Sequence, residues 1–401
     1  MTQGSLMTEV GFDAFDADNH YYEATDAFIR HVEPKMHKRC MQWATVDGRE
    51  RLLVAGRINR FIPNPTFDPV ARPGCLDDYF RGRTAAADMR EAFGKLEPIS
   101  PAFRDRDARI ELLDAQGLRG CFLFPTLGVG MEAALEHDVD ALAAAFGGFN
   151  RWLADDWGFA HRDRLFAAGY LSLADPDWAL DELDWLIAND VRVVNMRPSS
   201  VPDGAGGRRS LGHPAHEPVW QRLSEHGITV AMHSGDSGYG FVLEHWGVDS
   251  EFESFRYNTL KSLLTYSPIS DALASLLAEG VLSRHRNLRV ATIETGSEWV
   301  WPFVKKLAKT YSQQRHAFEE DPLEVFRRQV WISPYYEDDL QGLRDLIGAD
   351  HMLFGSDFPH AEGLADPMSF VRDLGGFSDD EIELVMRTNG LSLTERAPAA
   401  A

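Results

Sequence analysis

The stretch FDADNH at residues 15–20 decides the fold, because it joins a short β-type run to ionisable side chains at the point where the run ends. Asp16, Asp18 and His20 alternate along this stretch, so we expect them on one face of a strand. Two later segments repeat the arrangement, AMHSGD at residues 231–236 and FGSDFPHAEG at residues 354–363. If these strands are parallel, their polar ends meet at the same edge of the sheet.

Eight short β-type runs occur along the chain, and a helical pattern follows each of them. The runs lie at residues 12–18, 120–125, 165–173, 191–196, 228–233, 288–294, 330–333 and 352–356. The helical patterns lie at residues 105–116, 132–162, 178–189, 217–226, 267–279, 298–318, 338–347 and 379–388. This count predicts an α/β fold, the (β/α)8 TIM barrel, and a doubly wound open sheet is the alternative.

Two connections are too long to be simple loops of such a barrel. The first holds an Asp47-Gly48 turn between β-type runs, which indicates a hairpin. We therefore predict an inserted β-containing cap subdomain at residues 21–118, a barrel formed by residues 1–20 and 119–395, and a frayed tail at residues 396–401. The second connection, residues 234–266, is rich in Gly, Ser and aromatic residues and is expected to form a lid.

Composition excludes several classes of protein. The 62 acidic and 40 basic residues of the 401 give a formal net charge of −22, which disfavours binding to nucleic acid or to an anionic membrane. Cys40, Cys75 and Cys121 are too few and too scattered for a disulfide framework or a cysteine metal site. There is no apolar run long enough to span a membrane. We expect a cytoplasmic protein that binds a small molecule.

Five ionisable side chains stand at or just after predicted strand ends and should converge on one mouth of the barrel. They are Asp18, His20, His233, Glu294 and Asp357. Imidazoles mixed with carboxylates suit Mn, Fe or Zn, so the set predicts one or two divalent metal ions per chain. A single such residue is more often a hydrogen-bonded core histidine or a turn-forming aspartate, and only the coincidence of several favours a metal site.

The segments FDADNH, AMHSGD and FGSDFPHAEG resemble the amidohydrolase superfamily, specifically its amidohydrolase-related branch, which includes aminocarboxymuconate semialdehyde decarboxylase. The resemblance implies that His20, His233 and Asp357 bind one divalent metal. Asp18 stands where the first histidine of the usual pair would be, and its charge favours Mn or Fe over Zn. Oligomeric assembly, with like or unlike subunits, is also implied by this resemblance.

Glu294 replaces the histidine that acts in acid/base chemistry in the decarboxylases of that branch. Three interpretations stay open: an acid/base group, an extra ligand that completes a dinuclear site, or a residue that only orients a ligand. If Glu294 is an extra ligand of a dinuclear site, Glu294→Gln lowers the metal content from two ions towards one. Unchanged metal content with lost turnover would instead identify an acid/base group.

The remaining candidates lie in the loops that follow the strands. Arg197 would anchor a substrate carboxylate, with a salt bridge to a lid carboxylate as the alternative. His360, together with Glu294 and Asp357, is a candidate for catalysis. Weaker candidates for substrate contact or support of the site are Asn19, Glu23, Tyr335, Tyr336 and Glu362.

The resemblance implies a metal-dependent hydrolase or carboxy-lyase. The primary expectation is hydrolysis of a small organic acid or acyl derivative by a metal-activated water. Non-oxidative decarboxylation of a carboxylic acid and oxygenation at a dinuclear iron/manganese site are the alternatives. A catalytically silent subunit of a hetero-oligomer is the alternative outside enzymes, and metal content per chain separates it from the others.

Overall fold

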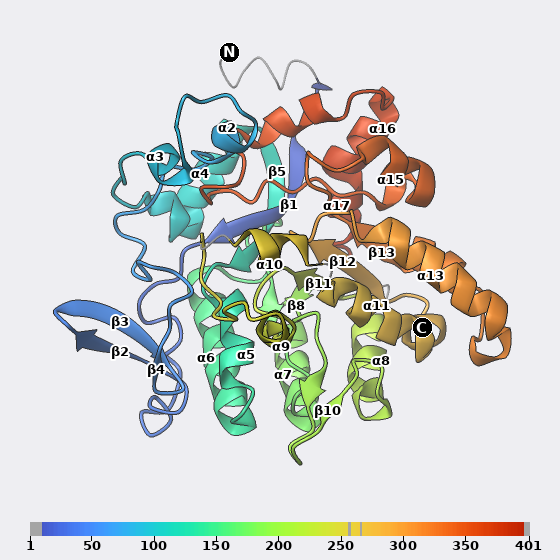
Figure 1. The fold of residues 1–401 in the computed structure, drawn as a ribbon, viewed down its shortest axis with the longest axis horizontal. Helices are drawn as coiled ribbons and strands as arrows, with labels where there is room; N and C mark the ends of the chain where they lie inside the picture. The colour runs from blue at the N-terminus through green and yellow to red at the C-terminus, as the bar shows by residue number, and fades with distance from the viewer. Residues whose placement is uncertain (1–9, 256–257, 265–266, 397–401) are drawn as a thin grey trace.

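Parallel strands form seven of the eight strand positions of a barrel in the computed structural model, which describes residues 10–255, 258–264 and 267–396 (Figure 1). The strands are β1 (Ala14–Tyr21), β5 (Leu118–Pro125), β6 (Leu165–Ala167), β7 (Gly169–Tyr170), β8 (Val193–Asn195), β11 (Thr229–His233), β12 (Arg289–Ile293) and β13 (Val330–Ile332). β6 and β7 are separated by one residue and act as a single barrel strand.

The eighth strand position is taken by residues 352–358, which close the barrel by two parallel bridges. Met352 bridges to Ile332 of β13, and Phe358 bridges to Asn19 of β1. The TIM barrel predicted from the alternation of strands and helices is therefore confirmed.

The interior of the barrel is filled by alternate residues of the strands, because neighbouring side chains of a strand point to opposite faces. Phe15, Phe122, Phe124 and Phe166 are all at most 3% exposed and pack together there. The rest of this cluster consists of smaller apolar side chains: Ala17, Ala168, Val193, Ala231, Ala291, Ile293, Leu353 and Leu393. The lumen is therefore a packed core.

Helices surround the strands (Figure 1). The longer ones are α4 (Arg106–Gln116), α6 (Val139–Asp156), α7 (Pro176–Ala188), α8 (Glu217–His226), α11 (Pro268–Ala278), α13 (Val300–Gln313), α14 (Pro322–Gln329) and α15 (Leu340–Ile347). The shorter ones are α2 (Asp77–Phe80), α3 (Met89–Phe93), α5 (Met131–Leu135), α9 (Gly240–His245), α10 (Thr259–Leu263), α12 (Val281–Arg284), α16 (Asp379–Glu383) and α17 (Asn389–Ser392).

The single helix predicted at residues 132–162 is wrong, because two helices occupy this stretch. α5 ends at Leu135, and the side chain of Asp138 then accepts a hydrogen bond from the N–H of Ala141 at the start of α6. An aspartate in this position satisfies an N–H group that has no partner within the helix, so it starts a new helix.

Residues between β1 and β5 hold a three-stranded antiparallel sheet, seen at one side of the molecule in Figure 1. Its strands are β2 (Met41–Val46), β3 (Arg49–Val54) and β4 (Arg57–Ile58). Asp47 and Gly48 connect β2 to β3 with φ angles of 50° and 72°, the left-handed conformation that tight hairpins need. The predicted hairpin is confirmed. A further small hairpin is formed by β9 (Val201–Pro202) and β10 (Arg208–Arg209).

The second long connection carries α9 and α10 and contacts the insertion. The N–H of Ser254 donates to the carbonyl of Phe61 at 2.8 Å. The rings of Phe61 and Phe252 stack with centroids 4.5 Å apart. The insertion after β1 and the connection after β11 therefore meet.

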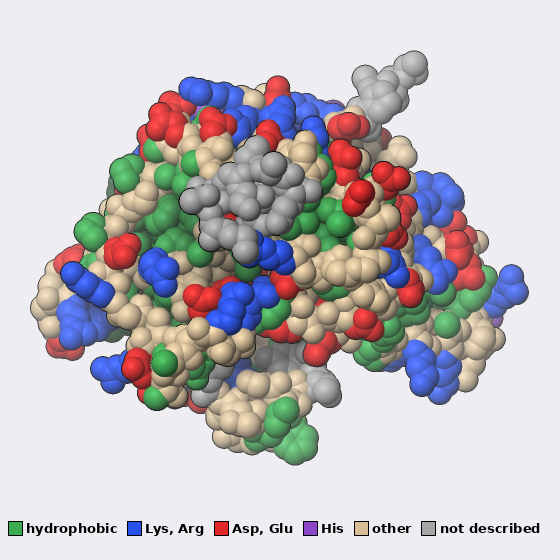
Figure 2. All heavy atoms as spheres, turned by 90° about the horizontal axis from the view of Figure 1, so that it is seen from above, with side chains coloured by type: hydrophobic (Ala, Val, Ile, Leu, Met, Phe, Trp, Pro, Cys, Tyr) green, Lys and Arg blue, Asp and Glu red, His purple; other side chains and the backbone are tan. Residues whose placement is uncertain are grey.

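Charged side chains are dispersed over the face of the molecule drawn in Figure 2. Figure 2 shows Lys and Arg interspersed with Asp and Glu on the face seen from above, with hydrophobic side chains between them. Within the part of the chain that the structure describes, no helix is both long and apolar enough to cross a membrane. Cys40, Cys75 and Cys121 are buried free thiols. The predicted frayed tail at residues 396–401 lies outside the described residues except for its first residue.

Candidate metal centre

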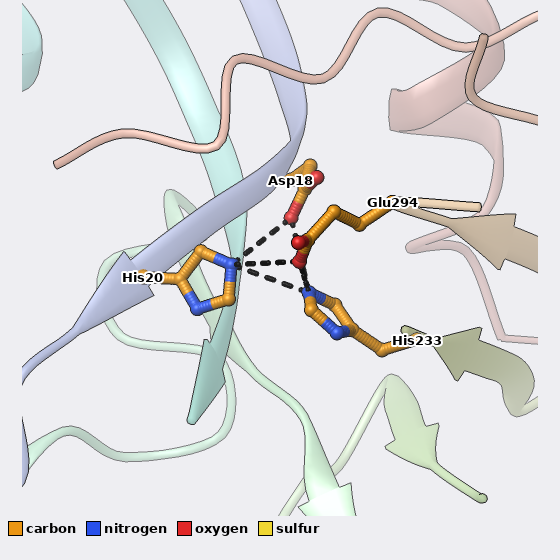
Figure 3. Close-up of side chains that lie close together, drawn as sticks. All are labelled: Asp18, His20, His233 and Glu294. Atoms are coloured by element: carbon orange, nitrogen blue, oxygen red, sulfur yellow. Dashed lines mark hydrogen bonds and ion pairs between the residues drawn. The ribbon is translucent and has the colours of Figure 1, made fainter. Parts of the chain in front are cut away.

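Four predicted ligands point toward one another at the mouth of the barrel (Figure 3). The Nε2 atoms of His20 and His233 lie 3.2 Å apart. Asp18 Oδ1 lies 3.3 Å from the first of these atoms and 3.4 Å from the second. Glu294 Oε2 lies 3.1 Å from His233 Nε2 and 4.0 Å from His20 Nε2. These ligand atoms all lie within 4.8 Å of one another.

Asp357 approaches the same group from the eighth strand position. Its Oδ1 atom lies 3.4 Å from His20 Nε2. A second group of possible ligands is formed by His20, Asp357 and His360. The structure thus brings together all five residues predicted to bind metal, and His20 belongs to both groups.

A β-bulge in β1 separates Asp16 from Asp18 and His20. The pairing of β1 with β5 shifts register between Asp16 and Asn19, so the strict alternation of side chains is broken there. Asp16 does not join the metal-ligand groups, contrary to the expectation that all three residues share a face. Its carboxylate accepts hydrogen bonds from the N–H of Asp18, the side chain of Asn19, and the N–H and hydroxyl of Ser356.

Close packing between the first and eighth strand positions depends on Gly355. A Cβ atom at this position would lie 2.6 Å from the Cβ of Asp18 and 2.7 Å from the Oγ of Ser333. Any larger residue would therefore push Asp18 away from the two imidazoles. Gly355 allows the chain segment that carries Asp357 to lie directly beside β1.

Backbone conformation turns two of the carboxylates toward the group. Glu294 and Asp357 have φ angles of 52° and 54°, in the left-handed region that residues other than glycine rarely adopt. The Tyr335 hydroxyl donates to the Glu294 carbonyl at 2.6 Å and holds this turn. A strained backbone kept at the end of a barrel strand is typical of a functional site.

Burial sets the protonation states of the group. Burial, reinforced by the neighbouring His360, lowers the pKa of His20 to about 3, so the ring is neutral and offers a lone pair. Burial followed by repulsion from Asp357 raises the pKa of Glu294 well above its usual value. Burial would also raise the pKa of Asp18, but the two adjacent imidazoles outweigh it and lower that pKa.

A divalent cation fits these residues. Asp18 Oδ1 is buried and accepts no hydrogen bond, although two ring nitrogens lie 3.3 and 3.4 Å away. Donor atoms that surround one ion at about 2.1 Å in a tetrahedron lie about 3.4 Å apart. The spacing and the mixture of carboxylate and imidazole are those of a site for a divalent metal.

The hydrogen bonds of His360 define which ring nitrogen faces the group. Nδ1 lies 2.5 Å from Asp357 Oδ1, and Nε2 lies 3.0 Å from the hydroxyl oxygen of Thr126. That hydroxyl donates to the carbonyl of Tyr21 at 2.8 Å, so its oxygen accepts from Nε2–H of His360. His360 is therefore fixed between Thr126 and Asp357, and its Nδ1 faces the metal-ligand group.

Three predicted candidates lie elsewhere or are already engaged. Arg197 donates to Glu136 at 2.9 Å, a salt bridge to the residue that follows α5 and not to a carboxylate of the predicted lid, and it does not line the cavity over the metal-ligand group. The hydroxyl of Tyr335 is used by the carbonyl of Glu294 rather than directed at the cavity. The guanidinium of Arg81 stacks on the ring of Tyr336, 3.4 Å from its centroid.

Glu23 supports the loop after β5. Its carboxylate is 1% exposed and accepts from the N–H groups of Leu127 and Gly128. Burial raises its pKa to about 7, while the hydrogen bonds from these two N–H groups act against that shift. Glu23 thus acts as a buried loop support, in keeping with the expected role beside the site.

Arg109 and Ser356 were missed by the reasoning from sequence. Arg109 is fully buried, donates to the carbonyl of His20 at 2.8 Å and hydrogen-bonds the side chain of Asn19. It lies in α4, where charged residues are usually solvated, so no local pattern marked it. Ser356 directly precedes Asp357 in the quoted segment, and this position was an available signal.

A cavity of about 470 Å3 opens over the group. His20, His233, Glu294 and His360 form part of its lining, whereas its other walls are mainly apolar side chains from the two long connections. Glu294 has 26% of its side chain exposed, compared with 1% for each of the two imidazoles and 5% for Asp18. Glu294 is therefore the carboxylate of this group that a bound molecule reaches most readily.

Comparison with known proteins gives a family model and several solved structures. The family model described as amidohydrolase matches residues 100–392. An amidohydrolase from Mycobacterium avium subsp. paratuberculosis K-10 is 43% identical, with a TM-score of 0.90, over 96% of this chain and 98% of that chain. The comparison with curated proteins found no match.

Two more distant structures share the fold. A 5-carboxyvanillate decarboxylase from Novosphingobium aromaticivorans, complexed with manganese, is 15% identical with a TM-score of 0.59, over 98% of this chain and 99% of that chain. A dihydroxybenzoic acid decarboxylase from Polaromonas sp. JS666, with bound manganese, is 12% identical with a TM-score of 0.54, over 96% and 97% of the two chains.

Proposed function

Because the chain belongs to the amidohydrolase family, we propose that this metal-dependent enzyme hydrolyses an acyl derivative at the group formed by Asp18, His20, His233, Glu294 and Asp357. The observation that carries the proposal is the placement of Glu294. Its carboxylate faces the cavity, 26% exposed, with Oε2 3.1 Å from the Nε2 of His233. A base in this position reaches both a water molecule and the substrate.

We assign the metal to Asp18, His20, His233 and Asp357. A divalent cation held there would lower the pKa of a water molecule and polarise the carbonyl of the substrate. The two possible ligand groups share His20, whose Nε2 atom lies 3.3 Å from Asp18 Oδ1 and 3.4 Å from Asp357 Oδ1, and one nitrogen lone pair binds one ion. This sharing supports one ion per chain, which leaves Glu294 for acid/base chemistry.

Glu294 then transfers a proton from the water molecule to the leaving group. Oε2 accepts a proton from the water whose oxygen bonds to the acyl carbon, and it delivers that proton to the atom that leaves. The products are an acid and the protonated leaving group. Tyr335 holds the backbone of Glu294 through its carbonyl, so it acts as a positioning residue, and His360 lies against Asp357, with Nδ1 2.5 Å from Oδ1.

Decarboxylation of a carboxylic acid is the competing function. It is favoured by the pKa of Glu294, which burial and Asp357 raise well above the usual value, because a carboxyl group that retains its proton can protonate carbon. The two reactions have different products: hydrolysis takes up water, whereas decarboxylation releases CO2.

The test uses manganese-loaded protein, 4-nitrophenyl benzoate as an acyl substrate and 2,6-dihydroxybenzoate as a carboxylic acid, in H2 18O. We expect 4-nitrophenol release with one heavy oxygen in the benzoate formed. CO2 release from the second compound, without hydrolysis of the first, would replace the proposal by its competitor.

Metal analysis of Glu294→Gln decides the role of Glu294. We expect turnover to fall about 100-fold or more with the metal content unchanged at one ion per chain. A fall in metal content would make Glu294 a ligand and contradict the assignment. Glu298→Gln is the matched control, because Glu298 lies four residues further along the same loop and is exposed.

A further inference from the structure

The cavity over the metal-ligand group has two chemically different parts. Its floor carries the imidazoles of His20 and His233 and the carboxylate of Glu294. Its walls are aromatic and aliphatic, and they include Phe61, Phe67, Phe93, Leu96, Phe252 and Phe255. The volume of about 470 Å3 lies within the range of pockets that enclose drug-sized ligands. The space therefore exceeds what a small acid needs.

The apolar walls come from the insertion after β1 and the connection after β11, which contact each other over the cavity. Phe61 from the insertion stacks on Phe252 from the connection after β11, with centroids 4.5 Å apart. Phe93 from the insertion meets Phe255 edge to face at 4.8 Å. A hydrogen bond of 2.8 Å from Ser254 to the carbonyl of Phe61 joins the same two segments. The walls are thus a built hydrophobic chamber.

The ionisable side chains that line the cavity are carboxyl groups and imidazoles. Among the described residues that line it, these are Glu253, Glu294, Glu362, His20, His233 and His360, with neither lysine nor arginine. Arg197, the cation predicted to anchor a carboxylate, is instead paired with Glu136 outside this cavity. An anionic group placed along the walls would lose its hydration without gaining a lysine or arginine of the described lining.

We propose that the enzyme acts on a compound whose acyl carbon lies at the metal-ligand group and whose remaining part is an uncharged, bulky hydrophobic group, aromatic or alicyclic. The proposal rests on the proposed function, because it places the reacting carbon at that site. The proposal goes beyond that function because it assigns the hydrophobic chamber to the acyl group of the substrate. It excludes small polyanionic acids as the preferred substrates.

Hydroxamates test this directly, because the hydroxamate group binds divalent metals and its tail can be varied. Calorimetry on manganese-loaded protein would compare acetohydroxamate, 2-naphthohydroxamate and 6-carboxy-2-naphthohydroxamate. We expect the naphthyl tail to tighten binding about 50-fold, from burial of roughly 100 Å2 of apolar surface. We expect 6-carboxy-2-naphthohydroxamate to bind at least about tenfold more weakly than 2-naphthohydroxamate. Equal affinity for all three compounds would overturn the proposal.

Variants locate the effect in the chamber. Phe61→Ala and Phe252→Ala should reduce the gain from the naphthyl tail about tenfold and leave the affinity for acetohydroxamate unchanged. Phe241→Ala is the control, because Phe241 lies on the same connection, is 64% exposed and does not line the cavity. Leu96→Arg adds a cation at a lining residue that is 45% exposed, so the carboxylated compound should recover its lost affinity. An unchanged preference in all of these variants would contradict the proposal.

A measurement on metal-free protein separates the metal-dependent function from the role of the hydrophobic chamber. The neutral dye 1-aminoanthracene should gain fluorescence in wild type and in Phe241→Ala, and much less in Phe61→Ala. If dye binds in this pattern while no hydroxamate binds, the metal-dependent function fails and the hydrophobic chamber stands. If acetohydroxamate binds but neither the dye nor the naphthyl tail does, the chamber assignment fails and the function stands.

Discussion

The carboxylate of Asp16 accepts hydrogen bonds from both the backbone N–H and the hydroxyl of Ser356, at 3.0 and 2.5 Å, although 340 positions separate the two residues. The same carboxylate also accepts from the N–H of Asp18 and the side chain of Asn19. One buried group thus joins the chain segment that carries Asp18 to the segment that carries Asp357. Asp16 sets the distance between two predicted ligands without contacting the cavity.

Asp16→Asn should therefore weaken metal binding as well as stability. An amide places a donor where the carboxylate accepted from donors, so we expect a loss of about 1–3 kcal/mol in the free energy of unfolding. Manganese affinity should fall about tenfold or more, as for other changes beside metal ligands. Thermal unfolding and calorimetry measure the two effects. Asp13→Asn, at an exposed position just before β1, is the control, and equal behaviour of both variants would refute the role.

Added metal should stabilise the folded chain. The ligand atoms converge only in the folded protein, so Mn2+ at about 100 times its Kd should add about 2.7 kcal/mol to the stability. The melting temperature of the protein stripped with a chelator should rise on addition of Mn2+. His233→Ala and Asp18→Ala should abolish this rise, because each removes an atom of the group in Figure 3. A rise that persists in both variants would place the metal elsewhere.

Stability should depend on pH through Glu23. Its pKa is raised from 4.5 to about 7 in the folded protein, chiefly by burial. A carboxyl group with a raised folded-state pKa adds stability below the unfolded pKa, and this stability is lost as pH rises through the folded pKa. The wild type should thus lose about 2–3 kcal/mol from this group between about pH 4.5 and 7.5.

Glu23→Gln should remove this dependence. The glutamine side chain keeps an oxygen for the N–H groups of Leu127 and Gly128. The variant should match the wild type near pH 5 and exceed its stability near pH 8. Urea unfolding at the two pH values measures the difference in stability between the variant and the wild type. A difference that stays constant across this range would show that the protonation state of Glu23 does not change.

Arg197 should behave as a structural cation. Its side chain is 3% exposed and pairs with Glu136 at 2.9 Å, with Glu132 3.8 Å away. Arg197→Met should cost about 3 kcal/mol, because it leaves the buried carboxylate of Glu132 without its cation, whereas Glu136 keeps a salt bridge to Arg208 at 3.1 Å. Arg197→Met combined with Glu132→Gln should recover part of that loss. An increase in KM without any loss of stability would instead restore the predicted role in anchoring a substrate carboxylate.

Much of the architecture could be predicted from residues close together in the sequence. The alternation of β-type runs and helical patterns indicated the barrel, because secondary-structure periodicity is a local property. The position of His20, His233 and Asp357 at strand ends indicated a shared site, since the carboxyl ends of barrel strands meet at one mouth. The Asp47-Gly48 hairpin was equally local.

Tertiary structure alone decided how each polar group is used. The bulge in β1 turned Asp16 away from Asp18 and towards Ser356, which comes near only when the eighth strand position closes the barrel. Arg109 binds the carbonyl of His20 and Arg197 binds Glu136, and no pattern in the neighbouring sequence predicts such long-range pairs. The hydrophobic chamber likewise arises where two connections far apart in sequence meet.

Sequence alone thus determined which elements form and which residues stand at their ends. Long-range packing decided which of those residues face the cavity, because each side chain pairs with the nearest complementary group in space.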